Sequence, residues 1–274
     1  MANPFLNDKR LQQAATATAG AEGGGWAAPD PGAIVNPPIN DGPISSWTAR
    51  TMTVAGTASA TAILLLILLA AAAVGWLAVD EAPSGEVQFP ALAIVGLLVG
   101  LGVAIVLAFK PLWARFLAPV YAIAQGFLVG AISRAFNEAY DGIVVQAAGA
   151  TIAVFAVMLF LYRTRIIKVT DRMRRIVIGA TLGIAVFYGI SLLLNLFGVN
   201  VTFLSSASPL SIAFSFLVAG LAAFNLALDF DFIERGANQG MPKQTEWYAA
   251  FGVLVTLVWL YLEVLRLLAK LREN

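Results

Sequence analysis

The chain has 274 residues, of which 59% are hydrophobic and only 12% are charged, and its formal net charge is +1. Its mean hydropathy of +0.82 is far above that of an ordinary soluble domain, so we expect an integral membrane protein whose solvent is the bilayer. The basic residues form no continuous face, which argues against a nucleic-acid partner. The chain has no cysteine and no histidine, which excludes disulfides, thiolate sites and histidine-ligated metals.

The N-terminal segment, residues 1–46, is rich in glycine and proline and has little apolar periodicity. We expect it to be a disordered cytoplasmic tail. No apolar core follows Lys9 and Arg10 at the distance typical of a signal peptide, so we expect the first helix to be an uncleaved anchor.

Seven apolar runs of about 20 residues follow, the length that a helix needs to cross about 30 Å of hydrocarbon. They cover residues 54–79, 89–109, 112–136, 142–162, 176–197, 210–233 and 247–271. In lipid a backbone must satisfy its own hydrogen bonds, and these lengths suit helices and not barrel strands. The sequence therefore predicts an all-α membrane protein, with a seven-helix transmembrane bundle over residues 47–274.

The connections between these runs differ in basic residues, and six Lys and Arg residues crowd the connection at residues 163–175. By the positive-inside rule this loop is cytoplasmic, as is the N-terminus, in a multi-pass protein of the inner or plasma membrane. Seven crossings would place Arg266, Lys270 and Arg272 on the opposite side, against the rule. A re-entrant last segment is the alternative.

Glycines spaced four residues apart allow neighbouring helices to approach closely. Such pairs are Gly96 with Gly100, Gly126 with Gly130, and Gly179 with Gly183. We expect them to serve helix packing.

Ionisable residues inside membrane spans are costly and are therefore candidates for function. Asp229 lies in the sixth apolar run and Glu263 in the seventh. Asn225 lies four residues before Asp229, so the two share a helix face that extends back to Ser215. We expect this face to line an ion path.

Two of the acids also have a purely structural interpretation. Asp231 lies on another side of its helix, and its spacing to Arg235 suits an i,i+4 ion pair at a solvated helix end. We favour that interpretation over a role in gating or ion binding. Glu263 could form a local pair with Arg266 near the membrane interface, although we favour a role in the path.

If Asp229 and Glu263 face each other, the pair would tend to hold one proton, because two adjacent charges are unfavourable in a low dielectric. Loss of that proton would favour helix separation or entry of a cation, and oxygen ligands suit calcium. Calcium prefers about six to eight oxygens, so Asn225, backbone carbonyls and water would have to complete the site.

The third apolar run carries small and polar residues that would pack inside the bundle or line the path. These residues are Pro119, Tyr121, Gln125, Gly126, Gly130 and Ser133. Arg115 could reach an acidic partner and act as a latch, although such an arginine more often extends toward lipid headgroups.

Enzyme motifs are missing from the sequence. It has no Walker loop, no paired histidines and no G-x-S-x-G elbow, and a chain without histidine cannot build an ordinary serine triad. We expect a protein that is not an enzyme and carries no cofactor.

From about Ser46 to Leu271 the sequence resembles the Bax inhibitor-1 family, also called transmembrane Bax inhibitor motif proteins, and in particular its bacterial branch. The third-run segment from Ala118 to Ser133 carries part of this resemblance. The family's sixth helix has an aspartate followed four residues later by isoleucine, as do Asp229 and Ile233 here. Its last helix has a Leu-Tyr-Leu-Asp run, matched by residues 260–263 with glutamate in place of the aspartate.

The resemblance implies a seven-helix bundle with a central last helix, in which the two acids form a pH-sensitive di-carboxyl site that closes a calcium leak path. We therefore predict a pH-sensitive calcium leak channel whose partners are the bilayer, calcium ions or protons. A membrane interaction protein that modulates a protease or a stress or cell-death pathway is the main alternative, and a proton-coupled transporter is another. The sequence leaves the oligomeric state open.

Overall fold

The computed structural model describes residues 51–81, 87–88, 91–198 and 206–273. The predicted N-terminal tail lies outside these residues. The described elements are α3 (Val54–Leu77), β1 (Asp80–Glu81), β2 (Val87–Gln88), α4 (Ala91–Phe109), the short 3-10 helix η1 (Pro111–Trp113), α5 (Ala114–Ala139), α6 (Ile143–Arg163), α7 (Asp171–Leu196), α9 (Pro209–Asn238) and α10 (Thr245–Glu273). The two-residue strands pair antiparallel. The predicted all-α fold is confirmed, and the seven helices coincide with the seven apolar runs.

Side-chain caps fix where several helices begin. Thr53 accepts a hydrogen bond from the backbone N–H of Gly56 at the start of α3, and Thr170 accepts one from Met173 at the start of α7. Ser208 caps α9, whose first residue is Pro209. The cap at Thr170 explains why α7 begins at Asp171, five residues before the apolar run, so that Arg172, Arg174 and Arg175 lie within the helix.

Six of these helices are long and apolar enough to cross a membrane, and α4 is a shorter apolar helix. Many of their large apolar side chains are exposed on the protein surface, as in Leu66, Phe160 and Phe216. Such a surface is stable in lipid and not in water. The protein is therefore a multi-pass membrane protein.

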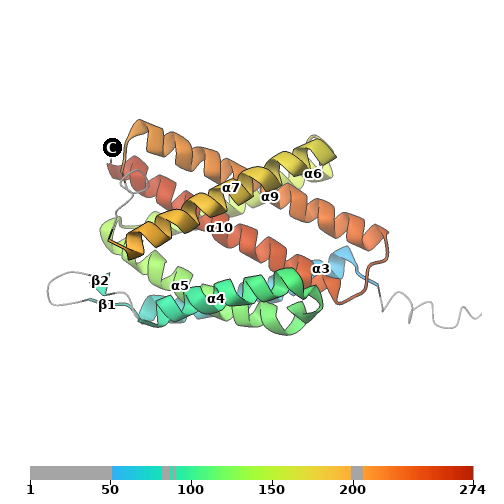
Figure 1. The fold of residues 1–274 in the computed structure, drawn as a ribbon, viewed down its shortest axis with the longest axis horizontal. Coiled ribbons are helices and arrows are strands. Elements are labelled where there is room, and N and C mark those ends of the chain that lie inside the picture. Colours follow the sequence, from blue (N-terminus) through green and yellow to red (C-terminus); the bar gives the residue numbers. More distant parts are fainter. Residues whose placement is uncertain (1–50, 82–86, 89–90, 199–205, 274) are drawn as a thin grey trace, which may run out of the picture. The chain divides into compact units, whose positions relative to one another are not determined.

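The last helix is central, as the family resemblance implies. α10 packs against α3, α5, α6 and α9, and Figure 1 shows it running between these helices. α5 packs along both α3 and α4. α7 is more peripheral, because its main helix partner is α9.

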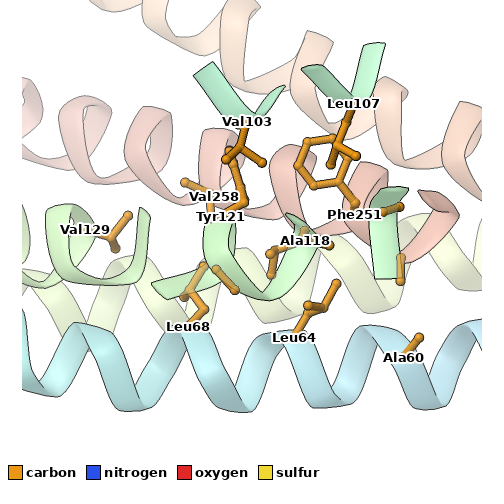
Figure 2. Packing of buried hydrophobic residues seen from close by; sticks show 14 residues of the cluster. Ala60, Leu64, Leu68, Val103, Leu107, Ala118, Tyr121, Val129, Phe251 and Val258 are labelled. Carbon is orange, nitrogen blue, oxygen red and sulfur yellow. The ribbon is translucent and has the colours of Figure 1, made fainter. Parts of the chain in front are cut away.

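One apolar cluster lies where α3, α4, α5 and α10 meet. Figure 2 shows Leu64 and Leu68 of α3, Tyr121 of α5 and Phe251 of α10 within it. The rings of Tyr121 and Phe251 are in edge-to-face contact with centroids 4.9 Å apart. This cluster holds α3, α4 and α5 against α10.

Candidate functional site

Polar side chains of α7, α9 and α10 lie against one another along the length of these helices. The name polar seam is used here for Arg174, Thr181 and Tyr188 of α7, Ser211, Ser215, Asn225, Asp229 and Asp231 of α9, and Thr256, Glu263, Arg266 and Lys270 of α10. Intervals of three, four and seven residues keep most of these positions on one face of their helix, whereas Asp231 lies on another side of α9 and joins the others through Arg174 of α7.

Asp231 lies at one end of the polar seam, beside the connection between α6 and α7. It forms ion pairs with Arg174 of α7 at 2.6 Å and with Arg235 of its own helix at 3.0 Å. The i,i+4 pair with Arg235 is the one anticipated from the sequence. The expectation of a solvated helix end is wrong, because α7 covers this position and leaves Asp231 only 7% exposed.

Asp229 and Asn225 occupy the middle of the polar seam. Asp229 accepts a hydrogen bond of 2.7 Å from the hydroxyl of Thr256 in α10. The amide nitrogen of Asn225 donates to the hydroxyl of Thr181 in α7 at 2.9 Å. These four side chains line one cavity of about 420 Å³ between the three helices. The shared face that the sequence predicts for Asn225 and Asp229 therefore does line an internal space.

Glu263 lies deeper along α10 and is 1% exposed. Its carboxylate accepts hydrogen bonds from the hydroxyl of Tyr188 at 2.9 Å and from Arg266 at 3.1 Å. Arg266 also donates to the hydroxyl of Tyr188 at 2.9 Å and lies over its ring. The local pair with Arg266, considered from the sequence as an alternative role for Glu263, is thus present in the structure.

The two acids singled out from the sequence lie apart. Asp229 contacts Thr256, and Glu263 is seven residues further along α10, which is two helical turns or roughly 10 Å. Each carboxyl group has its own partners, and no hydrogen bond joins Asp229 to Glu263 in the described structure. The di-carboxyl pair that shares a proton is therefore not assembled in this conformation.

Lys270 lies at the other end of the polar seam and is 3% exposed. Its ammonium group donates to the hydroxyls of Ser211 at 2.7 Å and Ser215 at 2.9 Å. Sequence reasoning did not single out Lys270, because a lysine four residues from the end of the chain resembles a solvated residue. Lys270 follows Glu263 by seven residues and so lies on the same face of α10, and this spacing could have indicated that it is buried.

Glu246 is a second buried residue that sequence reasoning missed. Its carboxylate accepts hydrogen bonds from the backbone N–H and the hydroxyl of Thr53, at 2.9 and 3.0 Å. It thereby ties the first turn of α10 to the start of α3. This contact is structural and lies outside the polar seam.

The candidate residues of α5 do not join the polar seam. Gln125, Gly126, Gly130 and Ser133 are buried, and Pro119 lies within the first part of the helix. Their neighbours are α3, α4 and α10: a Cβ atom on Gly126 or Gly130 would overlap backbone atoms of α3, and the hydroxyls of Ser133 and Tyr261 are 2.7 Å apart.

Arg115 has no acidic partner among the residues that the structure describes. Its side chain is exposed at the start of α5, and it forms no ion pair with any acid in the described ranges.

Binding of a metal ion would need several oxygen ligands close together. Within the residues that the structure describes, no group of three or more His, Cys, Asp or Glu could hold a metal ion. Asp229, Asn225, Thr181 and Thr256 together present a few side-chain oxygens around the cavity. This set suits brief contact with a cation better than tight binding of calcium.

Comparison with known proteins gives one family. A family model described as Bax inhibitor 1 like matches residues 3–273, which is essentially the whole chain. None of the curated proteins that were compared with the chain matches it.

Proposed function

The chain belongs to the Bax inhibitor 1 like family, and we propose that it lets calcium ions cross a cell membrane passively in a pH-dependent manner. The path we propose follows the polar seam, in an inner or plasma membrane, with the N-terminus in the cytoplasm. The observation that carries this proposal is Asp229, an acid within a membrane-spanning helix that lines a cavity and has no basic partner among the described residues.

The other acids of the polar seam differ from Asp229 because arginines neutralise them. Asp231 is paired with Arg174 and Arg235, and Glu263 with Arg266. An acid without a basic partner in lipid is unfavourable as an anion, so it will carry a proton or attract a cation. Asp229 is therefore the group through which we expect both pH and cations to act.

The direction of the pH effect follows from the charge of Asp229. The chain has no histidine, so a carboxyl group must provide any response near neutral pH. A protonated Asp229 is neutral, so it does not compensate a cation for the hydration energy that the cation loses on entering the path. An ionised Asp229 lowers the energy of a cation in the path, so calcium flux should rise as the pH rises.

Glu263 has a different expected role. Its charge balances that of Arg266, so Glu263→Gln leaves the Arg266 guanidinium without its anion. The resulting positive charge should oppose cations at every pH. Asp229→Asn should abolish the pH dependence, whereas Glu263→Gln should reduce flux and leave part of the pH dependence.

Calcium uptake into proteoliposomes at about pH 6 and about pH 8 tests the proposal. We expect flux in the native protein to rise by about tenfold, since one charge in a low dielectric is worth more than the roughly 1.4 kcal/mol of a tenfold change. Asp229→Asn should give equal, low flux at both pH values. Asp171→Asn, which changes an exposed acid at the start of α7, is the matched control and should behave as the native protein.

Flux no higher than in empty liposomes at either pH would contradict the channel. The alternative, a membrane interaction protein in which the acids only hold helices together, would then be favoured. This alternative predicts that Asp229→Asn changes the thermal stability of the protein but does not change ion flux.

A further inference from the structure

The cavity beside Asp229 has two kinds of wall. Thr181, Asn225, Asp229 and Thr256 supply polar groups on one part of its lining. Four aromatic residues supply the rest, together with small aliphatic side chains. These aromatic residues are Phe232 of α9 and Tyr248, Phe251 and Trp259 of α10. Its volume of about 420 Å³ lies in the range of small-molecule sites, which is roughly 300 to 1,000 Å³.

The acid in this cavity has free hydrogen-bonding capacity. Oδ2 of Asp229 accepts from Thr256, whereas no described donor bonds to Oδ1. Oδ1 lies 3.4 Å from the point where a Cβ atom on Gly252 would stand. The absence of a side chain at Gly252 therefore leaves open space beside the unbonded oxygen.

The aromatic wall favours one class of cation over another. The faces of aromatic rings attract cations, and the effect is strongest for cations that lose their water easily. The rings of Phe232 and Tyr248 are in edge-to-face contact, with centroids 6.1 Å apart and planes at 71°. Calcium needs many oxygens and gains little from such a wall. An organic ammonium ion needs one anion and buries its carbon atoms against the rings.

α7 forms the third side of this cavity. α7 packs mainly on α9 and, among the described residues, contributes Thr181 to the cavity lining. It reaches α10 through long side chains such as Tyr188.

We propose that this cavity is a binding site for a monovalent organic ammonium ion, with its charged group against Asp229 and its apolar part against Phe232, Tyr248 and Trp259. Such a ligand is held by the charge of Asp229, so protonation of this group weakens binding. The site goes beyond the proposed function and does not depend on it, because binding is measured without ion flux. A bound ammonium ion would also occupy the acid on which the proposed calcium path depends.

Isothermal titration of the full-length protein in detergent at about pH 8 tests this site, with benzyltrimethylammonium as the probe. We expect saturable binding of one probe per chain, and at least about tenfold weaker binding to Asp229→Asn. Trp259→Leu should weaken binding about three- to tenfold, in line with a desolvated cation–π contact. Gly252→Ala adds one methyl group at ordinary contact distance and should also weaken binding, in a protein that keeps its fold.

Two matched controls isolate the charge and the ring. Asp171→Asn removes an exposed acid at the start of α7, and Trp113→Leu removes an exposed tryptophan of η1. Both should bind the probe within about twofold of the native protein.

The uncharged isostere neopentylbenzene separates an ammonium site from an apolar groove. Equal binding of the two compounds would overturn the proposal, because the cavity would then hold any apolar chain, including a lipid acyl chain. Absence of saturable binding, or unchanged binding to Asp229→Asn, would overturn it too. Calcium flux that persists in any of these cases leaves the proposed function standing.

Discussion

At the scale of single residues, the interior of this bundle places each buried charge against a specific partner. Lys270 is the clearest example, because two serine hydroxyls of α9 accept from an ammonium group that is almost fully buried. A buried charge that loses its hydrogen bonds costs more free energy than the bonds themselves contribute. The two serines should therefore matter for stability, although each is a small side chain.

We expect Ser211→Ala combined with Ser215→Ala to lower the free energy of unfolding by about 1–3 kcal/mol, since the ammonium group loses both acceptors. Thermal unfolding in detergent measures this loss. Adding Lys270→Met should restore stability, because the charge that needs the acceptors is then gone. Ser59→Ala is the control, as Ser59 is exposed and bonds only within α3. A double variant that melts like the native protein would contradict this role.

At the scale of helices, glycine determines how closely α5 approaches α3. A Cβ atom on Gly126 would overlap the carbonyl oxygen of Leu68, and one on Gly130 would overlap that of Ala72. These are backbone atoms of α3, so the two helices would have to separate. Gly149 of α6 has open space around it, with no heavy atom within 4 Å of its Cβ position.

Gly130→Ala should lower the free energy of unfolding by about 1–3 kcal/mol, the usual cost of overpacking. Gly149→Ala should leave stability unchanged or slightly raised, because alanine is the better helix former. Thermal melts of the two variants, compared side by side, test this difference. Equal melting temperatures would show that α3 and α5 separate at no cost.

At the scale of the whole molecule, the order of the spans fixes which loops share a side of the membrane. One span, α6, separates Asp141 from Lys168, and two spans, α7 and α9, separate Lys168 from Lys243. All three residues are exposed. Lys168 and Lys243 should therefore lie on one side, which we expect to be the cytoplasm, and Asp141 on the other.

The chain has no cysteine, so single-cysteine variants can be labelled without background. In intact cells a membrane-impermeant maleimide should label Asp141→Cys, and should label Lys168→Cys and Lys243→Cys only after permeabilisation. Labelling of Asp141→Cys and Lys168→Cys from the same side would contradict the crossing by α6. Reversed labelling of all three would keep the spans and invert the orientation.

Much of the fold follows from the sequence, because the bilayer restricts a chain to apolar helices of fixed length. The close approach at Gly126 and Gly130 was also predictable from spacing. The same spacing gave a wrong prediction at Gly179 and Gly183, which face open space. Glycine spacing shows that one face of a helix carries small side chains, but it does not show whether another helix packs against that face.

The candidate site was predictable only in part, for a related reason. Periodicity placed Asn225 and Asp229 on one face and paired Glu263 with Arg266, because these relations lie within a single helix. The separation of Asp229 from Glu263 depends on how far α9 is shifted along α10, which one helix cannot reveal. Lys270 and Glu246 lie near helix ends, where charged residues usually reach water, so their burial depends on neighbouring helices.

Helix α7 bonds to the bundle through Arg174, Thr181 and Tyr188, which are spaced seven residues apart on one face. Because all three point the same way, turning α7 about its own axis would break the contacts to Asp231, Asn225 and Glu263 together. Contacts that break together make release cooperative, so loss of one of them should weaken the hold on α7 at the other two. The ion pair of Arg174 with Asp231 and the bond of Tyr188 to Glu263 make two of these three contacts sensitive to charge, so the seating of α7 should depend on the charges of α9 and α10.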